Sequence, residues 1–272
     1  MPVRARASRP LALAAAPPWL DKRDPVVAGV IRRWRELTTL PRSRRAGAGE
    51  PLLVACSGGA DSSALVLMLA AATDKGIVAH IVHDLRPKRE ALADCDAAKR
   101  LAARVGWRFV QASIKVRALA GNAEANARRV RYEALATLAR RCGVGFIATG
   151  HQGDDQIETV LMRLMRGSGP TRLAGIRARR VLPGLPRVEV IRPMLTVSAA
   201  DARRVCRGAG WQWQEDRTNA DVRLLRNRLR VEVVPRLRKM RPDLAERVGV
   251  LAAQSEALDK MFGRAAGGGG GG

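Results

Sequence analysis

The hydrophobic pattern between residues 52 and 166 alternates short apolar runs with longer amphipathic stretches. Short apolar runs bounded by turn residues are typical of buried strands, and apolar residues at helical spacing indicate helices. Strands are predicted at 52–56, 77–82, 107–112 and 144–149, and helices at 62–73, 88–105, 122–142 and 154–166. A further helix begins after a cap at Asp24. This alternation predicts an α/β fold with a doubly wound parallel sheet, in which ligands bind at the carboxyl ends of strands.

The pattern loosens after Gly167 and becomes mainly helical near the C-terminus. There we predict a strand at 187–191, a helix at 198–209, a short strand containing Trp211 and Trp213, and helices at 221–233 and 242–262. We therefore expect a disordered basic leader at 1–23, a main α/β domain at 24–216, a small helical C-terminal segment at 217–263 and a flexible glycine-rich tail at 264–272.

Basic residues outnumber acidic residues along the whole chain. The formal net charge is +24, and 47% of the residues are hydrophobic, which is enough for a folded core. The charge favours a polyanionic partner such as nucleic acid, although arginine-rich codon usage in a GC-rich genome would raise the same count.

The N-terminal leader and the cysteines indicate in which cellular compartment we expect the protein. The first twenty residues contain arginine, serine and many alanines but no acid, which is the composition of an organelle transit peptide. We favour the alternative, a leader on a cytoplasmic bacterial protein. No stretch is long and apolar enough for a membrane span. The four cysteines are widely spaced without a C-x-x-C motif, so we expect buried free thiols and neither zinc nor an iron–sulfur cluster.

The segment from Ser57 to Ser62 reads S-G-G-A-D-S and lies between a predicted strand and a predicted helix. Adjacent glycines let backbone N–H groups turn around an anion, and the helix N-terminus and serine hydroxyls add donors. The lysine of a GxxxxGK[ST] loop is missing, so this is not the common NTPase phosphate loop. Asp61 supplies instead a hard oxygen that suits Mg²⁺ on a nucleotide. Taken alone, the segment also fits a glycine turn with an ordinary helix cap.

A second polar segment, 150–159, follows the fourth predicted strand and opens the next helix. Asp155 and Glu158 share one face of that helix, because residues at i and i+3 are neighbours. Their place at a strand end favours a functional role over simple compensation of the helix dipole. On the preceding helix, Arg128 and Arg131 present either a fork for phosphate or carboxylate or a solvated basic face.

The pattern S-G-G-x-D-S after a strand resembles the pyrophosphate loop of the N-type ATP pyrophosphatases, the PP-loop superfamily. The remaining motifs resemble one family within it, tRNA(Ile)-lysidine synthetase. The matching segments are His80 to Arg86, Ala127 to Tyr132, Gly150 to Thr159, Leu164 to Gly169, Arg192 to Leu195, and Asp216 to Arg230. The resemblance covers roughly residues 25–235. It implies an adenine nucleotide alpha-hydrolase-like fold, with 24–216 as the ATP-binding catalytic domain.

The resemblance implies joining of free L-lysine to C2 of the first anticodon cytidine of tRNA(Ile) with a CAU anticodon. ATP first adenylates the cytidine, and pyrophosphate and AMP are released. Catalytic roles are implied for Asp61, Asp155 and Glu158, with Asp61 also holding Mg²⁺. The implied ATP-binding residues are Ser57, Gly58, Gly59, Ala60, Asp61, Ser62, His83, Gly150 and His151. Lysine binding is implied for Arg131, Asp155 and Glu158, and tRNA binding for Arg166, Ser168, Arg226, Arg228 and Arg230.

Departures from the family pattern leave alternatives open. Asp84, Met194, Arg217 and Thr218 differ mildly from it, and family members usually continue into further domains that help select the tRNA. A sister enzyme that thiolates tRNA cytidine is disfavoured because C-x-x-C motifs are absent. A small-molecule amidating ligase is disfavoured by the positive charge, and a non-catalytic tRNA-binding relative by the intact acidic residues. Both a monomer and a homodimer remain compatible with the sequence.

Overall fold

The structure is a computed structural model that describes residues 6–7, 21–39, 51–85, 87–117, 119–121, 123–182, 185–215 and 225–267. The chain divides into two compact units. The sheet unit comprises Met1–Gly150, Arg179–Pro193 and Ala200–Glu215, and the helical unit comprises His151–Ala178, Met194–Ala199 and Asp216–Gly272. This division differs from the predicted boundary after residue 216, because residues 151–178 pack with the C-terminal helices.

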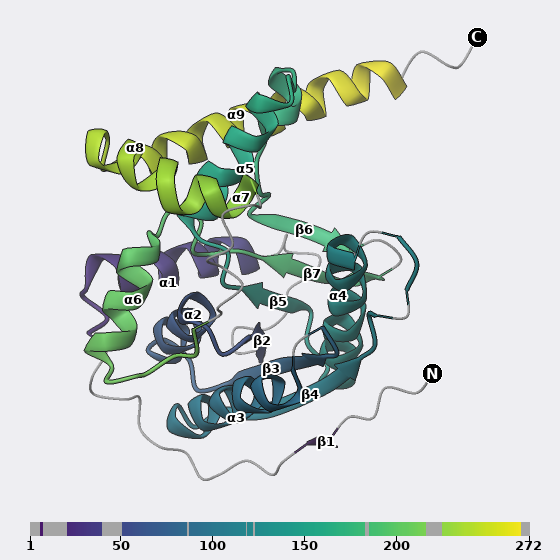
Figure 1. Ribbon diagram of the computed structural model, residues 1–272, viewed down its shortest axis with the longest axis vertical. Helices are drawn as coiled ribbons and strands as arrows, with labels where there is room; N and C mark the ends of the chain where they lie inside the picture. Colours follow the sequence, from purple (N-terminus) through teal and green to yellow (C-terminus); the bar gives the residue numbers. More distant parts are fainter. Residues whose placement is uncertain are drawn as a thin grey trace. The chain divides into compact units, whose positions relative to one another are not determined.

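Within the described residues, the sheet unit contains a seven-stranded sheet (Figure 1). In spatial order the strands are β1 (Arg6–Ala7), β4 (Arg108–Ile114), β3 (Gly76–His83), β2 (Leu52–Ala55), β5 (Phe146–Thr149), β7 (Leu185–Ile191) and β6 (Arg179–Leu182). The strands from β4 to β7 run parallel, whereas β1 and β6 pair antiparallel at the two edges.

The order of the strands reverses direction at β2. From β2 the chain steps outward to β3 and β4, and it then returns to β5 on the other side of β2. The predicted doubly wound parallel sheet is therefore confirmed. Ligands of such sheets bind where the order reverses, outside the carboxyl ends of the strands. Here that position is the end of β2 and β5.

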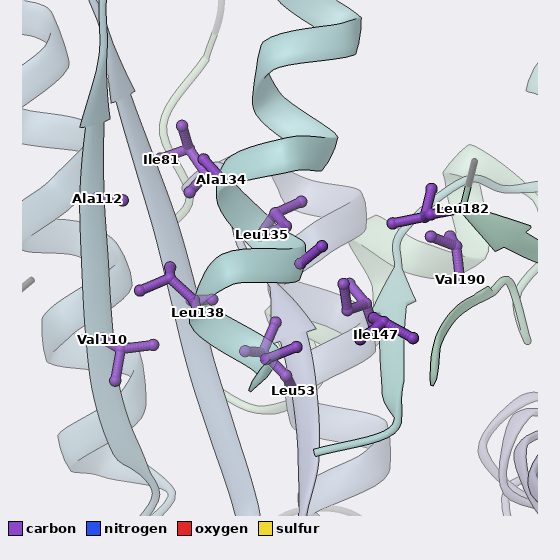
Figure 2. Close-up of a cluster of buried hydrophobic side chains, with 14 of the residues drawn as sticks. Leu53, Ile81, Val110, Ala112, Ala134, Leu135, Leu138, Ile147, Leu182 and Val190 are labelled. Carbon is purple, nitrogen blue, oxygen red and sulfur yellow. The ribbon is translucent and has the colours of Figure 1, made fainter. Parts of the chain in front are cut away.

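Helix α4 (Ala123–Arg141) covers one face of the sheet. Figure 2 shows Leu135 and Leu138 of α4 packed over strand residues that include Leu53 and Ile147, and each of these four is at most 2% exposed. Further helices of the unit are α1 (Pro25–Thr38), α2 (Ala60–Ala70), α3 (Lys88–Arg104) and α6 (Ala199–Gly208). Every residue of α2 from 62 to 70 is buried, so α2 is a central helix with little freedom to move.

The helical unit is built around α5 (Gly153–Met165). The other elements are the 3₁₀ helix η2 (Pro170–Leu173), α7 (Leu225–Arg228), the π-helical turn η4 (Leu229–Val233), α8 (Val234–Met240) and α9 (Leu244–Gly267). Its small core joins Ile157 of α5, Val234 of α8 and Ala245 of α9. None of the helices in the described part of the chain is long and apolar enough to cross a membrane.

Three predicted features at the C-terminal side differ in part from the structure. Residues 211–215 form no strand, because Gln214 N–H donates instead to the carbonyl of Gly58 at 3.0 Å. The helix expected at 221–233 does not stop at residue 233: it runs through η4 into α8, because Pro235 falls in the first turn of α8 and needs no N–H there. Residues 264–267 of the expected flexible tail belong to α9, whereas 268–272 lie outside the described residues.

Two other differences concern the N-terminal side and the sheet edge. Most of the expected leader, 1–23, lies outside the described residues, but 6–7 form β1 against β4. Strand β6 was not predicted, since its Arg179-Arg180 pair breaks the apolar pattern. Arg179 is held across the strands by Glu189, with 2.7 Å between Nη2 and Oε1.

The close approach of Trp107 to Gly76 predicts the effect of a single methyl group. A Cβ at Gly76 would lie 2.0 Å from the Trp107 ring, so Gly76→Ala should destabilise the fold by about 1–3 kcal/mol through overpacking. Gly29→Ala is the control, because Gly29 lies in α1 with nothing within 4 Å of its Cβ position. That variant should gain about 0.5–1 kcal/mol. Urea unfolding of the two variants measures both values, and equal stabilities would contradict this account.

Candidate active site

The loop between β2 and α2 is closed by two serine side chains. Ser57 N–H donates to Ser62 Oγ at 3.1 Å, and the two hydroxyl oxygens are also 3.1 Å apart. Gly59 caps α2 and offers no side chain to the first turn. The N–H groups of that turn have no partner within the helix and are not taken by a cap side chain. This is the arrangement that binds phosphate at a helix N-terminus.

Two features of the loop require glycine. Gly58 has φ +92°, a left-handed conformation, and a Cβ there would lie 3.2 Å from the carbonyl oxygen of Asp94 on α3. Gly58 also accepts the hydrogen bond from Gln214 N–H. The loop is therefore held from two sides by segments far away in the sequence.

His80 of β3 supports the start of the loop. It is 4% exposed, and its Nδ1 donates to the carbonyl of Cys56 at 2.8 Å. Burial lowers the pKa of His80, against the opposing effects of this hydrogen bond and of Asp94, and the positive charge of Arg131 lowers it further. His80 is thus neutral at pH 7 and acts as a structural donor. His83, the implied ATP ligand, lies half-buried at the end of the same strand.

Gly150, at the end of β5, lies directly against the loop. A Cβ at this position would be 2.9 Å from the backbone nitrogen of Ser62 and 3.0 Å from the backbone of Asp61. The structure thus brings together four implied ATP-binding residues, Ser57, Asp61, Ser62 and Gly150, where the strand order reverses. His151 is the next residue and begins the helical unit.

Asp61 is the acidic residue in the first turn of α2 and is half-buried. The described residues contain no group of three or more His, Cys, Asp or Glu side chains suited to a metal ion. A single carboxylate fits Mg²⁺, which is usually held by one or two carboxylates together with nucleotide phosphates and water. It does not fit a zinc or iron–sulfur site.

The cysteines near the loop are unreactive. All four cysteines are free, and Cys56, Cys95 and Cys206 are buried. Burial raises the pKa of Cys56, and that of Cys206 to about 12. Since the thiolate is the reactive form, neither of these two thiols is a nucleophile at neutral pH.

A second polar cluster lies within the helical unit, at the start of α5. Asp155 is 9% exposed and Glu158 is 0% exposed. Arg226 donates to Glu158 Oε2 at 2.8 Å and to Asp155 Oδ1 at 3.0 Å. Arg230 donates to Glu158 Oε1 at 2.7 Å and to Asp155 Oδ1 at 2.9 Å. We call these four residues the carboxylate–arginine cluster.

The same turn of α5 holds other contacts that the sequence did not indicate. Gln152 caps the helix by accepting from Asp154 N–H, and Gln152 N–H donates to Asp155 Oδ2 at 3.1 Å in a capping box. Arg238 of α8 pairs with Asp154, which also accepts from Ala199 N–H at 3.0 Å. Asp154, Asp155 and Glu158 are therefore each paired with arginine from residues 226–238.

The implied tRNA-binding residues separate into two groups. Arg226 and Arg230 bind the carboxylates that the resemblance assigns to lysine. Arg228 points elsewhere, pairs with Glu232 at 3.1 Å and has a side chain 65% exposed. Arg166, at the end of α5, is exposed, and Ser168 is half-buried. Arg131, the remaining implied lysine ligand, is exposed on α4 in the sheet unit.

Comparison with known proteins agrees with this geometry. Residues 35–237 match the PP-loop domain family. The fold is similar to that of the U34-tRNA thiolase NcsA from Methanococcus maripaludis, with a TM-score of 0.63 over 86% of this chain and 79% of that chain. At 14% identity this likeness shows the fold alone. The site and the fold therefore define a PP-loop protein.

Sequence relatives narrow the family further. The chain is 39% identical over 223 residues to tRNA(Ile)-lysidine synthase from Thermus thermophilus, with 76% of this chain and 42% of the relative covered. The corresponding enzyme from Salinispora arenicola is 38% identical over 255 residues, covering 87% of this chain and 71% of the relative. The chain belongs to the tRNA(Ile)-lysidine synthase family. It spans about two fifths of the length of the Thermus relative.

The contact of Gly150 with the loop gives a test of the site. In Gly150→Ala the new methyl group must displace the backbone of Asp61 and Ser62, at a cost of about 1–3 kcal/mol. If nucleotide binding requires the original loop position, the Kd for ATP should rise about 5- to 150-fold. Calorimetric titration with ATP measures this, with Gly29→Ala as the control. A stably folded Gly150→Ala protein that binds ATP as tightly as the wild type would refute the placement.

Proposed function

We propose that the chain joins L-lysine to the first anticodon cytidine of tRNA(Ile), using ATP and Mg²⁺, in the cytoplasm. One observation carries the proposal: in a chain of this family, the S-G-G-A-D-S loop lies where the strand order reverses, and no cap side chain binds the N-terminus of the helix that follows it. The loop residues then hold the pyrophosphate that leaves when the cytidine O2 attacks the α-phosphate of ATP.

The loop contributes to the first half-reaction by stabilising the leaving group. Hydroxyls of Ser57 and Ser62 and the first-turn N–H groups of α2 donate to phosphate oxygens, in a site whose donors are already oriented. Asp61 would hold Mg²⁺, which supplies positive charge to the pyrophosphate when bound. His80 and Gln214 keep the loop in place and do not touch the nucleotide in this mechanism.

The second half-reaction needs a deprotonated amine. The ε-amine of lysine has a reference pKa of about 10.4 and arrives protonated. Asp155 and Glu158 attract the ammonium and accept its proton, so that the neutral amine attacks C2 and AMP leaves.

The ion pairs of Asp155 and Glu158 with arginine limit how the lysine ammonium can bind in this step. In the cluster two carboxylates face two guanidinium groups, so the formal charge is zero. An ammonium group gains little from a neutral cluster, and we infer that lysine displaces Arg226 or Arg230 from at least one carboxylate oxygen. Both side chains are about one-third exposed, at 37% and 34%, so either guanidinium has water available when it leaves.

Thiolation of tRNA is the weaker candidate. That chemistry delivers sulfur through reactive cysteines or a cluster held by several thiolates. Among the described residues the cysteines form no metal-binding group, and Cys56 and Cys206 remain protonated. Ligation of an amine needs no thiol and fits the buried carboxylates better.

Release of AMP tests the proposed reaction. The wild type should release AMP from ATP only when bulk bacterial tRNA and lysine are both present for turnover. Asp61→Ala should abolish this release but stay folded, because losing one first-turn acid costs only about 1 kcal/mol or less. Asp96→Ala removes an exposed carboxylate on α3 and serves as the control. Full activity of Asp61→Ala, or AMP release that ignores tRNA, would refute the proposal.

Separating the half-reactions tests the carboxylates. Glu158→Gln alone leaves the guanidinium of Arg230 less compensated, so we pair it with Arg230→Gln to keep the cluster neutral. The double variant should still adenylate the tRNA but transfer lysine about 10² to 10⁴ times more slowly, the usual value of a positioned proton acceptor. Radiolabelled AMP and labelled lysine on the tRNA are followed in parallel.

Arg230→Gln alone is the matched control for this experiment. It keeps both carboxylates and lacks the same guanidinium, so the lysine transfer that the double variant loses beyond this control measures the role of Glu158. Adenylated tRNA that accumulates without lysine in the double variant supports the assignment. Equal loss of both steps would instead move Asp155 and Glu158 to nucleotide or metal binding.

A further inference from the structure

Two arginines of the sheet unit contact Tyr132, and a third lies on the strand beside one of them. Arg192 follows β7, and its Nη2 donates to the Tyr132 hydroxyl at 3.3 Å. The guanidinium carbon of Arg128, one helical turn before Tyr132 on α4, lies 5.2 Å from the centre of the Tyr132 ring. The third is Arg180 of β6, which is paired in register with Val190, two residues before Arg192. We call Arg128, Arg180 and Arg192 the arginine group.

The topology places this group at the carboxyl edge of the sheet. Arg192 comes directly after the last residue of β7, and Arg179, the neighbour of Arg180, is paired in register with Ile191. Helix α4 follows β4 and therefore starts at the same edge. The arginine group thus lies at the carboxyl edge of the sheet. This is the edge at which β2 ends and the phosphate loop begins.

The two exposed arginines of the group form no ion pair with an acidic side chain of the described residues. Arg128 and Arg180 are exposed, and among the described residues neither forms an ion pair with a carboxylate. The arginines next to them in the sequence do form such ion pairs: Arg129 pairs with Glu133 at 2.9 Å, and Arg179 pairs with Glu189. Arg192 is 2% exposed. Burial lowers its pKa, and the charges of Arg128 and Arg180 lower it further.

We propose that Arg128, Arg180 and Arg192 bind phosphate groups of an RNA backbone. Guanidinium groups match phosphate oxygens with two parallel hydrogen bonds, and an anion between them relieves the repulsion of like charges. Three arginines from three segments cover more surface than is needed to bind one small carboxylate ligand. The inference rests on the proposed function and specifies where the tRNA backbone contacts the sheet unit.

The salt dependence of tRNA binding tests the proposal. Each phosphate contact contributes about 0.7 to 0.9 to the slope of log K against log salt concentration. The double variant Arg128→Gln/Arg180→Gln should therefore have a slope shallower by about one to two and bind tRNA more weakly at low salt. Arg192 is left unchanged, because it is buried. The probe is bulk bacterial tRNA, measured by fluorescence anisotropy on the full chain.

The control is Arg100→Gln/Arg140→Gln, which removes two exposed arginines from α3 and α4 of the same unit. This control lowers the net charge by as much as Arg128→Gln/Arg180→Gln does. It should keep nearly the wild-type slope of log K against log salt concentration. Equal slopes in the two double variants would overturn the proposal. So would an unchanged tRNA slope together with a raised KM for ATP, since the group would then bind nucleotide phosphates. Wild-type protein that fails to bind tRNA or release AMP would refute the proposed function itself.

Discussion

The ion pairs between α5 and residues 226–230 are the constraint on which the helical unit depends. Glu158 is completely buried, and a buried carboxylate without a partner carries a desolvation penalty of several kcal/mol. Arg226 and Arg230 offset that penalty with five hydrogen bonds to Glu158 and Asp155. The C-terminal helices therefore supply the partners of these buried carboxylates, and they belong to the same compact unit as α5.

The phosphate loop is held by a different principle, the rigidity of its surroundings. Helix α2 is buried along almost its whole length, so its N-terminus is fixed relative to the sheet. The carbonyl of Cys56 is held by His80, that of Gly58 by Gln214, and Gly150 leaves no space behind Asp61. Because the donors need no rearrangement when the anion arrives, little of the binding energy is lost in ordering them. Both sites combine oriented groups with a buried support, but in the proposed mechanism the carboxylate–arginine cluster exchanges an arginine for its ligand, whereas the loop keeps its internal contacts.

The sequence predicted the parts of this protein that depend on local patterns. The alternation of strands and helices, the glycine loop and the placing of Asp155 and Glu158 on one helix face all follow from spacing within a few residues. It could not predict that Gln214 binds Gly58, or that Arg226 binds Glu158 across 68 positions, because no local pattern links such positions. The resemblance implies a tRNA role for Arg226 and Arg230, and that role stays a prediction. Their ion pairs with Glu158 could not be predicted, because an arginine looks the same in the sequence whether its partner is a phosphate or a buried carboxylate. Similarly, Arg179-Arg180 concealed the edge strand β6, in which Arg179 is held by an ion pair with Glu189 and Leu182 reaches the core.

The formal charge of +24 therefore overstates the positive surface available to a polyanion. Arg179, Arg226, Arg230 and Arg238 are engaged by Glu189, Glu158, Asp155 and Asp154, and their charges are largely cancelled within the fold. On our proposal the remaining positive charge attracts RNA, and the arginine group is one place where it lies. That group combines one buried and two exposed guanidinium groups, and the exposed two form no ion pair with an acid among the described residues. Such a surface is stable without a ligand only because water solvates Arg128 and Arg180, and it is therefore ready to exchange that water for phosphate oxygens.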